Sequence, residues 1–558
     1  MGTVQIIITL ILFLVLVVPM GKYLFKVATG EKGRFDTFFD IIDNFIFKII
    51  GVDKEEMNWK QYMISILTAN VIMAICAFII LKIQGFSILN PNKISTMGSG
   101  LSFNTVASFI TNTDIQDYAG ESGVSYLSQM IVMTFLMFTS AATGFSVALA
   151  FIRGLVGKKK TVGNFFVDFT RVITRVLLPL SIIIAVLFLS QGVPQTLHGN
   201  ITVSTIEGKF QDIAMGPVAS LEAIKQIGTN GGGFFAANSA HPFENPTPLS
   251  NLIQILAMML LPGAIVYNFG LMLKNKKQGW VIFAAMGILL VAVIPVCYLA
   301  EKAGNPALIH AGLSNIMGNM EGKEVRFGIA QSSLFSTITT AFTTGSVNNM
   351  HDSLTPLGGF VPLWNMMLNV VFGGKGVGFM NMMMYAIITV FICGLMVGRT
   401  PEFLGKKIES KEIKLVALAI IIHPILILIP SAIALKIPGG LSSISNSGFH
   451  GLTQVVYQYT SAAANNGSGM AGLTVNTTFW NVTTGIVMLL GRYVSMILLL
   501  SVASSLASKQ AVPESAGTFR TDNWLFTVIL ICIVLIIGAL TFLPALALGP
   551  ISEHLMLH

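Results

Sequence analysis

The sequence predicts an all-α integral membrane protein. About ten transmembrane helices would form four fused span–pore loop–span repeats around a central pore, with one flanking helix at each end. Of the 558 residues, 53% are hydrophobic and only 10% are charged, whereas soluble proteins carry about 25% charged residues. The apolar runs are continuous and about 20 residues long, which favours helices over the shorter, alternating strands of a barrel. In addition, four similar polar stretches recur at nearly equal spacing.

Ten apolar segments have the length that a hydrocarbon core of ~30 Å requires. The first is read as a spanning helix rather than a signal peptide, because it lacks a preceding basic region and is followed by Lys22, Lys26 and Lys32. The ten segments are 4–25, 61–83, 127–150, 172–191, 250–273, 280–300, 362–397, 414–436, 479–507 and 524–547.

These segments divide the chain into six consecutive units. An N-terminal spanning helix with a cytoplasmic linker occupies 1–60, and a C-terminal spanning helix occupies 524–547. Between them we predict repeat 1 (61–150), repeat 2 (172–273), repeat 3 (280–397) and repeat 4 (414–507). Irregular backbone at membrane depth must be buried in protein or face water, so the four loops are expected to meet at one axis.

The basic residues indicate the orientation in the membrane. If the first segment runs from outside to inside, the inner linkers are 22–60, 151–175, 274–279, 398–414 and 492–520, and they carry 24 of the 33 Lys and Arg residues. This positive-inside bias places both termini and all four polar loops on the extracytoplasmic side. The net charge of +8 therefore reflects topology, and nucleic acid is not expected as a partner.

Each repeat carries one polar loop, between a short amphipathic piece and a long apolar run. The loops, whose first residues are 118, 114 and 122 residues apart, begin at Thr111, Thr229, Thr343 and Asn465. Ordinary turns are the simpler interpretation of any one loop. Four loops in register instead suggest four quarters that each lend backbone oxygens to one site.

Rings of backbone carbonyls replace the water shell of potassium in channels. An inward-turned carbonyl needs positive φ, which glycine tolerates, and we expect this at Gly232, Gly345 and Gly467. Thr hydroxyls and Asn amides would add oxygens or brace the loops. The predicted K+ filter comprises Thr111, Asn112, Thr113, Thr229, Asn230, Gly231, Gly232, Thr343, Thr344, Gly345, Asn465, Asn466 and Gly467.

The seventh apolar segment is interrupted by glycines. Gly373, Gly374, Gly376 and Gly378 surround Lys375, and such a run should break a helix. One interpretation is a kink that allows close helix packing. The other is an irregular loop under the filter that gates the ion, which Lys375 favours because a cation at membrane depth is expensive and usually functional.

Acidic residues follow the filter loops. They could concentrate cations at the mouth or could be solvated loop charges; they are Asp114, Asp117, Glu121, Glu244 and Asp352. His241 with Glu244, and His351 with Asp352, could suggest the metal site of a membrane-embedded metallohydrolase. No HExxH sequence or third ligand at suitable spacing accompanies them, so structural hydrogen bonding is the favoured interpretation.

Further stretches combine with these loops into a specific pattern. They are 230–235, 238–248, 347–352 and Gly398-Arg399-Thr400-Pro401-Glu402-Phe403-Leu404-Gly405-Lys406-Lys407-Ile408. Together they resemble, over essentially the whole chain, the KdpA family, the potassium-translocating subunits of bacterial Kdp potassium-transporting ATPases. The modest departures are Lys375 in the broken helix and the acidic Asp114 after the first filter loop.

The resemblance implies a potassium transporter built on four channel-like repeats in the bacterial cell membrane. It implies a complex with a P-type ATPase subunit (KdpB-like) and small accessory subunits (KdpC-like, possibly KdpF-like). In such a complex K+ is the transported ligand, and only the partner uses ATP. The ion would leave the filter sideways, through an intramembrane tunnel toward the ATPase subunit.

The sequence agrees that energy comes from another subunit. It contains neither a DKTGT-like phosphorylation sequence nor a GxxxxGK[ST] phosphate loop, so a non-hydrolytic subunit is expected. Arg399, near the inner end of the seventh segment, is an interfacial anchor, a brace for the broken loop or a contact with the ATPase partner. The alternative function is a stand-alone Trk/Ktr-like potassium channel or symporter.

Overall fold

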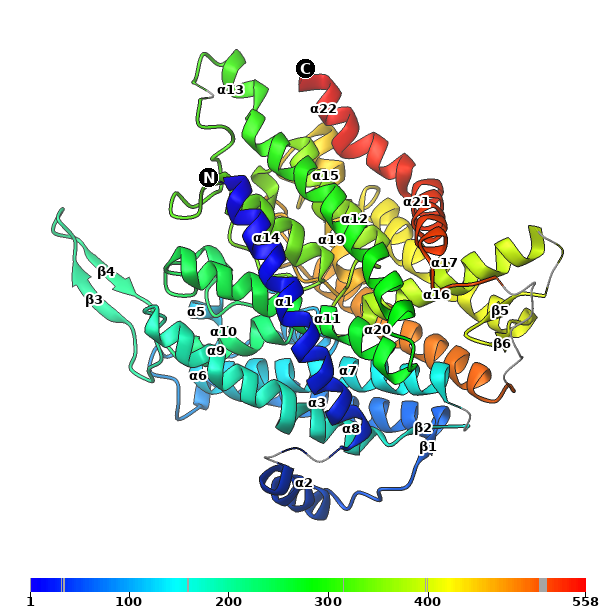
Figure 1. Ribbon diagram of the computed structural model, residues 1–558. Helices are drawn as coiled ribbons and strands as arrows, with labels where there is room; N and C mark the ends of the chain where they lie inside the picture. The colour runs from blue at the N-terminus through cyan, green and yellow to red at the C-terminus, as the bar shows by residue number, and fades with distance from the viewer. Residues whose placement is uncertain are drawn as a thin grey trace.

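The computed structural model describes residues 2–31, 33, 36–157, 160–314, 316–396, 398, 400–510 and 519–557. Within these residues, ten helical stretches are long and apolar enough to cross a membrane, as predicted (Figure 1). They are Gly2–Thr29, Trp59–Phe86, Tyr126–Val156, Phe165–Ser190, Pro248–Met272, Lys276–Leu308, Val377–Met396, Ser410–Ala434, Thr478–Ala507 and Trp524–Leu557.

The main helices of these stretches follow the predicted order. They are α1 (Gly2–Thr29), α3 (Trp59–Ile83), α7 (Phe135–Val156), α9 (Leu178–Ser190), α11 (Pro248–Met272), α12 (Lys276–Ala303), α16 (Val377–Met396), α17 (Ser410–Ala434), α20 (Thr478–Ala507) and α21 (Trp524–Leu546). Side-chain caps start several of them. Asn58 caps α3 in a capping box with Gln61, and Thr247 caps α11 just before Pro248, which suits the first helical position.

A short, largely buried helix lies between the two main helices of each quarter of the chain. The four short helices are α4 (Ser99–Ile110), α10 (Val218–Ile227), α14 (Gly328–Ala341) and α19 (Gly448–Ala464). In the sequence, α4 lies between α3 and α7, α10 between α9 and α11, α14 between α12 and α16, and α19 between α17 and α20. The outer helices α1 and α21 pack against α11 and α12 respectively. The predicted class of four span–pore loop–span repeats with a flanking helix at each end is confirmed.

The seventh span is broken as predicted. Helix α15 (Pro356–Leu368) ends in the left-handed residue Asn369, and α16 begins only at Val377. The intervening residues include three with positive φ, at Phe372, Gly373 and Gly376. The break is therefore an irregular loop of several residues rather than a kink in a continuous helix.

The remaining elements are short and join the spans. Three antiparallel two-stranded pairs are formed by β1 (Met57–Asn58) with β2 (Thr161–Gly163), β3 (Ile201–Ser204) with β4 (Phe210–Ile213), and β5 (Glu402–Phe403) with β6 (Lys406–Lys407). The other helices are α2 (Asp36–Ile50), α5 (Gly120–Gly123), α6 (Tyr126–Ser128), α8 (Phe165–Arg171), α13 (Pro306–His310), α18 (Pro438–Leu441) and α22 (Ser552–Leu557). Single 3-10 or π turns are η1 (Gln84–Phe86), η2 (Gln129–Thr134), η3 (Val172–Leu177), η4 (Asn238–Ala240), η5 (His351–Ser353) and η6 (Ala547–Ile551).

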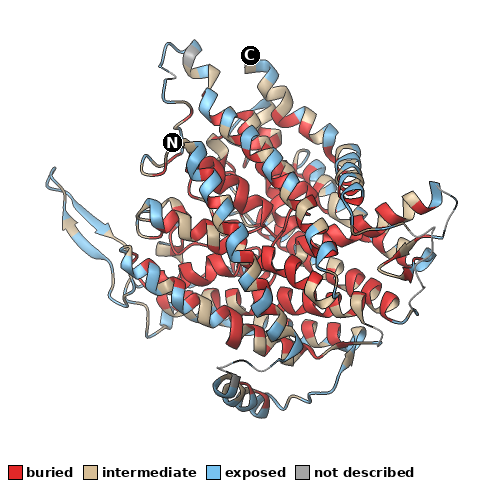
Figure 2. Ribbon diagram, viewed as in Figure 1, coloured by how far each residue is buried: buried red, intermediate tan, exposed pale blue. Residues whose placement is uncertain are grey.

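Burial separates the centre of the bundle from its lipid-facing rim. Buried residues fill the middle, and exposed residues lie on the outside of elements such as α1 and α2 (Figure 2). The exposed side chains of α1 are large and apolar, including Ile7, Ile11 and Val15. Such a surface suits contact with hydrocarbon rather than water.

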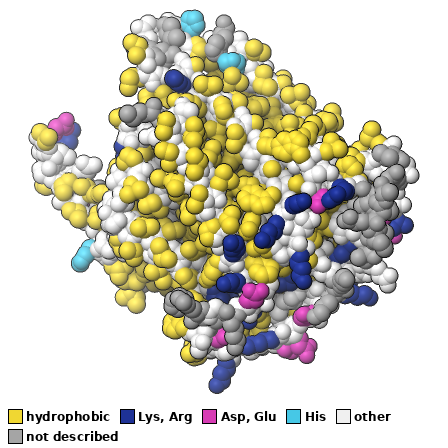
Figure 3. Space-filling view, viewed as in Figure 1, with side chains coloured by type: hydrophobic (Ala, Val, Ile, Leu, Met, Phe, Trp, Pro, Cys, Tyr) yellow, Lys and Arg dark blue, Asp and Glu magenta, His cyan; other side chains and the backbone are white. Residues whose placement is uncertain are grey.

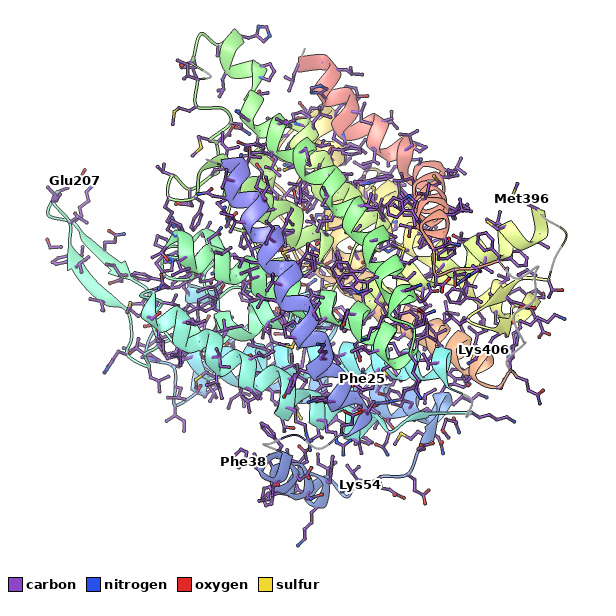
Figure 4. All side chains as sticks on the ribbon, viewed as in Figure 1. Phe25, Phe38, Lys54, Glu207, Met396 and Lys406 are labelled. Carbon is purple, nitrogen blue, oxygen red and sulfur yellow. The ribbon has the colours of Figure 1, made fainter. Side chains whose placement is uncertain are left out.

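Charge divides the two ends of the bundle. On the face shown in Figure 3, Lys and Arg side chains gather at the lower right, away from both chain ends marked in Figure 1. Figure 4 places Glu207 at the tip of the β3–β4 hairpin, and Lys54 and Lys406 on the other side of the molecule. Arg492 was counted among the basic residues of the inner linkers, and this assignment is wrong, because Arg492 lies buried inside α20.

Candidate functional site

The four short helices end in the same way. A left-handed residue follows each helix, at Asn112 (φ 60°), Thr229 (φ 45°), Thr343 (φ 42°) and Asn465 (φ 53°). The amide of the next residue donates back across the last turn, from Thr113 to Ser108 (3.0 Å), Asn230 to Lys225 (2.9 Å), Thr344 to Thr339 (2.8 Å) and Asn466 to Ser461 (2.9 Å). This is the Schellman arrangement of a helix C-terminus, and it directs the chain out of each of the four helices in the same way.

A second left-handed residue follows two positions later in every loop. These residues are Asp114 (φ 54°), Gly231 (φ 99°), Gly345 (φ 85°) and Gly467 (φ 109°). The expected positive φ is confirmed at Gly345 and Gly467 but is wrong at Gly232, because Gly231 takes that role. The first loop is also shifted by one residue: its register begins at Asn112 and not at Thr111, so the first spacing is 117 residues from Asn112 to Thr229.

The four loops close into a ring through one repeated contact. A methyl group on Gly231 would collide with the Thr344 carbonyl, one on Gly345 with the Asn466 carbonyl, and one on Gly467 with the Thr113 carbonyl. This contact joins the second loop to the third, the third to the fourth and the fourth to the first, whereas the first loop meets the second through a side chain. Side chains reinforce this order, since the Asn112 amide donates to the Thr229 carbonyl (2.7 Å) and the Asn465 amide donates to the Thr113 hydroxyl (2.9 Å).

At least one carbonyl of each loop has no hydrogen-bond donor in the described part of the chain. Among the hydrogen bonds of the described residues, none ends on the main-chain oxygens of Thr113, Asn230, Thr344 or Asn466. All four residues are buried. By contrast, the Gly231 carbonyl accepts from the Asn238 amide (2.7 Å). Buried carbonyls are almost always paired in proteins, so four unpaired ones in a ring could coordinate a dehydrated cation.

A buried ion-pair network supports the second loop from behind. The Lys225 ammonium lies 2.9 Å from Glu222 and 2.6 Å from Glu244, and all three side chains are fully buried. The other oxygen of the Glu244 carboxylate accepts from the Phe235 amide at 2.8 Å. The network therefore joins helix α10 to the segment that leaves the loop.

The broken seventh span lies directly beneath the ring. A methyl group on Gly374 would lie 2.9 Å from the Thr343 hydroxyl and 3.3 Å from the Thr229 hydroxyl. The next side chain, Lys375, is buried and donates from Nζ to the carbonyl of Ile227 at the end of α10. The glycine-rich break thus brings the Lys375 amine to the side of the loops on which helix α10 ends.

A family model described as KdpA, potassium-transporting ATPase A subunit, matches residues 7–555. The chain belongs to the KdpA family. The potassium-transporting ATPase potassium-binding subunit of Clostridium acetobutylicum is 65% identical over 558 residues, the full length of both chains. The subunit of the same name from Geobacillus kaustophilus is 58% identical over 546 residues, covering 98% of this chain and 97% of the relative. The resemblance inferred from the motifs is confirmed.

The fold likeness extends to a more distant transporter. The crystal structure of the potassium transporter TrkH from Vibrio parahaemolyticus matches with a TM-score of 0.55 at 13% identity, covering 89% of this chain and 97% of TrkH. At that identity the match shows the fold alone, which this KdpA-family chain shares over nearly all of its length.

The structure separates the five acidic residues that follow the loops. Glu244 is paired with Lys225, and Glu121 accepts from the Ala236 amide at 2.8 Å. Asp352 lies 3.2 Å from His450. Hydrogen bonds that His450 donates to the carboxylates of Asp352 and Glu553 raise the pKa of His450 to about 10.

The remaining two acids, Asp114 and Asp117, are 2% and 5% exposed, so neither is a solvated loop charge. Burial raises the pKa of Asp117 to about 7.

The histidines have local structural contacts. His241 stacks on Phe235 with ring centres 3.8 Å apart, and His351 Nδ1 lies 2.7 Å from the Tyr457 hydroxyl. Burial lowers the pKa of His351 to about 3. No group of three or more His, Cys, Asp or Glu residues that could hold a metal occurs in the described part of the chain.

The sequence did not predict the supporting roles of Lys225 and Arg492. Lys225 has one neighbouring acid in Glu222, three residues earlier on α10, but its second partner, Glu244, lies 19 residues further along the chain. Arg492 donates to the Ser140 carbonyl on α7 at 3.3 Å; a buried Arg inside an apolar segment was the available signal. Arg399 lies outside the described residues.

Proposed function

We propose that this chain is the potassium-selective binding and translocation subunit of an ATP-driven potassium importer. It binds K+ from the outer side in the four-loop carbonyl ring and passes it to a P-type ATPase partner. The observation that carries the proposal is the ring of four unpaired buried carbonyls, one from each quarter. The names of the relatives, which are potassium-binding subunits of potassium-transporting ATPases, support the same ion.

Within the filter, the predicted residues take different roles. The carbonyls of Thr113, Asn230, Thr344 and Asn466 coordinate K+, and the buried, unpaired hydroxyl of Thr229 adds a ligand at the inner end. The others shape the loops through their backbone or side chains; they are Thr111, Asn112, Gly231, Gly232, Thr343, Gly345, Asn465 and Gly467. Residues 61–150, 172–273, 280–397 and 414–507 act as the four repeat units.

The ion leaves the ring sideways, beside the broken span. A cavity of about 50 Å³ is lined by Asn369, Asn381, His423 and Asn465, among others. The amide oxygens of Asn369 and Asn381 are buried there without a hydrogen-bond partner in the described part of the chain. Such oxygens can replace water around a potassium ion on its way to the ATPase subunit.

The loop of Gly373, Gly374, Lys375, Gly376 and Gly378 acts as the gate at the inner end. Two like charges 4 Å apart repel by about 4 kcal/mol at an effective dielectric constant of 20. When the Lys375 amine beneath the ring is protonated, it therefore disfavours an ion that continues straight inward. This favours sideways exit and opposes leakage through the axis.

Lys375→Met is expected to let potassium leak without ATP. Removal of the charge lowers the barrier at the inner end, so passive rubidium flux into vesicles containing the purified assembly should rise by about tenfold or more. Lys48→Met, at an exposed position of α2, is the matched control and should leave the flux unchanged. Equal passive flux in Lys375→Met and the unaltered assembly would argue against the gate.

The assembly sits in the bacterial inner membrane with both termini extracytoplasmic. Its partners are a KdpB-like P-type ATPase subunit and KdpC-like and KdpF-like accessory subunits, and ATP is used by the ATPase partner alone. Arg399, at the inner end of the seventh span, braces the gate or contacts that partner. The shared fold with TrkH keeps a stand-alone potassium channel or symporter as the competing function.

Purification of the chain from its native membranes tests this proposal. We expect a stoichiometric partner of P-type ATPase size and ATP hydrolysis that potassium stimulates. A soluble nucleotide-binding ring in place of that partner, together with ATP-independent selective uptake, would support the channel or symporter instead.

A further inference from the structure

We propose that Asp114 and Asp117 form a second cation-binding site at the outer mouth of the ring. It takes up a partly hydrated alkali cation before the ion enters the carbonyls. The inference deepens the proposed function and rests on it, because it concerns the ion's approach to that same ring.

Both carboxylates are buried, and no cationic side chain among the described residues faces them. None of their four oxygens has a hydrogen-bond partner in the part of the chain that the structure describes. The amide of Gly232 and the side chain of Asn230 face Asp114 and partly offset the cost of its burial, whereas no donor faces Asp117 among the described residues. A buried carboxylate is costly unless a cation or several donors face it. The positive charge behind the second loop, Lys225, is already paired with Glu222 and Glu244.

Asp114 and Asp117 are among the residues that line a cavity next to the ring. Its volume is about 430 Å³, and Gly345, Gly467 and Gln458 line it as well. The same space therefore borders Asp114, Asp117 and the third and fourth loops of the ring. An ion held by the carboxylates would be next to the ring's outer end, within reach of its first carbonyls.

The position of Asp114 within the loop supports a role for its side chain. The equivalent left-handed positions in the other three loops are glycines, at Gly231, Gly345 and Gly467. Asp114 adopts φ 54° and so accepts a conformation that side chains disfavour. The first quarter therefore adds a carboxylate where the others add none, and it does so at the mouth.

Rubidium uptake by the purified ATP-driven assembly in vesicles tests the site. The variants are Asp114→Asn, Asp117→Asn and the double substitution, and the measured quantities are the half-saturating rubidium concentration and the maximal rate. Each is measured at low ionic strength and again with N-methylglucamine chloride added. Added salt shortens the screening length from about 10 Å at 0.1 M to about 3 Å at 1 M. High salt therefore suppresses long-range electrostatic attraction of the cation but not its direct binding to the two carboxylates.

We expect the double variant to raise the half-saturating concentration by about tenfold. The maximal rate and the preference for rubidium over sodium should not change, because the carbonyl ring is intact. The increase should persist at high ionic strength. Asp117→Glu should restore part of the affinity, which a merely structural role would not predict.

Two results would overturn the site: an unchanged half-saturating concentration in the double variant, or an increase that disappears at high ionic strength. Glu207→Gln, at the exposed tip of the β3–β4 hairpin, is the control and should behave as the unaltered chain. If the double variant does not assemble, Asp117→Asn alone must raise the half-saturating concentration, and its failure to do so counts equally against the site. An unaltered assembly that takes up no rubidium would instead overturn the proposed function.

Discussion

Replacing Gly345 with alanine is expected to abolish selective potassium uptake. Gly345 has a φ of 85°, and holding a residue with a side chain there costs about 1–3 kcal/mol. A methyl group would also collide with the Asn466 carbonyl and lie 2.8 Å from the Cα of Gly467. Both neighbours are backbone atoms of the ring, so relief of the clash must move the fourth loop and its carbonyl.

The measurement is rubidium uptake against competing sodium and ammonium, in vesicles that contain the assembled transporter. Displacement of one carbonyl that costs about 3 kcal/mol corresponds to roughly a hundredfold loss of affinity. Gly287→Ala is the matched control, since nothing lies within 4 Å of the added methyl group in helix α12. Normal affinity and selectivity in Gly345→Ala would contradict the ring as the selective site.

Lys225→Met is expected to destabilise the protein strongly and to weaken potassium binding. The substitution leaves Glu222 and Glu244 buried together without their shared cation. Removal of one partner from a buried ion pair costs about 3–5 kcal/mol. Because Glu244 also accepts from the Phe235 amide, the loss extends to the end of the second filter loop.

Thermal unfolding of the purified assembly in detergent checks this prediction, with rubidium affinity as a second readout. Lys209→Met is the control: its partner, Glu207, and Lys209 itself are about four-fifths exposed, and surface pairs contribute only about 0–1 kcal/mol. Addition of Glu222→Gln and Glu244→Gln to Lys225→Met should recover part of the stability, because no uncompensated charge remains. A Lys225→Met variant as stable as the control would show that the network has no such role.

Much of the fold could be predicted because hydropathy is a property of single segments. Continuous apolar runs identified the ten spans, and the glycines around Lys375 identified the broken one. The register of the first loop could not be read in the same way. Thr111 resembles Thr229 in sequence, but the end of α4 makes Asn112 the left-handed residue. The hydrogen bonds of the helix end, rather than residue identity, decide that register.

The candidate site was predicted in outline and not in its supporting contacts. The loop residues whose carbonyls are free of hydrogen bonds can be located in the sequence, because glycine and threonine recur there at nearly equal spacing. Contacts between residues that are distant in the chain cannot be read from the sequence. Nothing in the chain reveals that Lys225 faces Glu244 or that Lys375 reaches Ile227, 148 residues earlier. The distinction between paired and unpaired acids, which separates Glu121 from Asp114, likewise appears only when the loops are assembled.

The closing contact of the ring has a consequence for biosynthesis. Thr113 in the first loop meets Asn465 in the fourth, 352 residues later in the chain. During synthesis the loop of the first quarter therefore lacks its partner in the membrane until the ribosome has synthesised the fourth quarter. A chain truncated after the third quarter should be recognised by membrane proteases as incomplete, whatever the quality of its earlier helices.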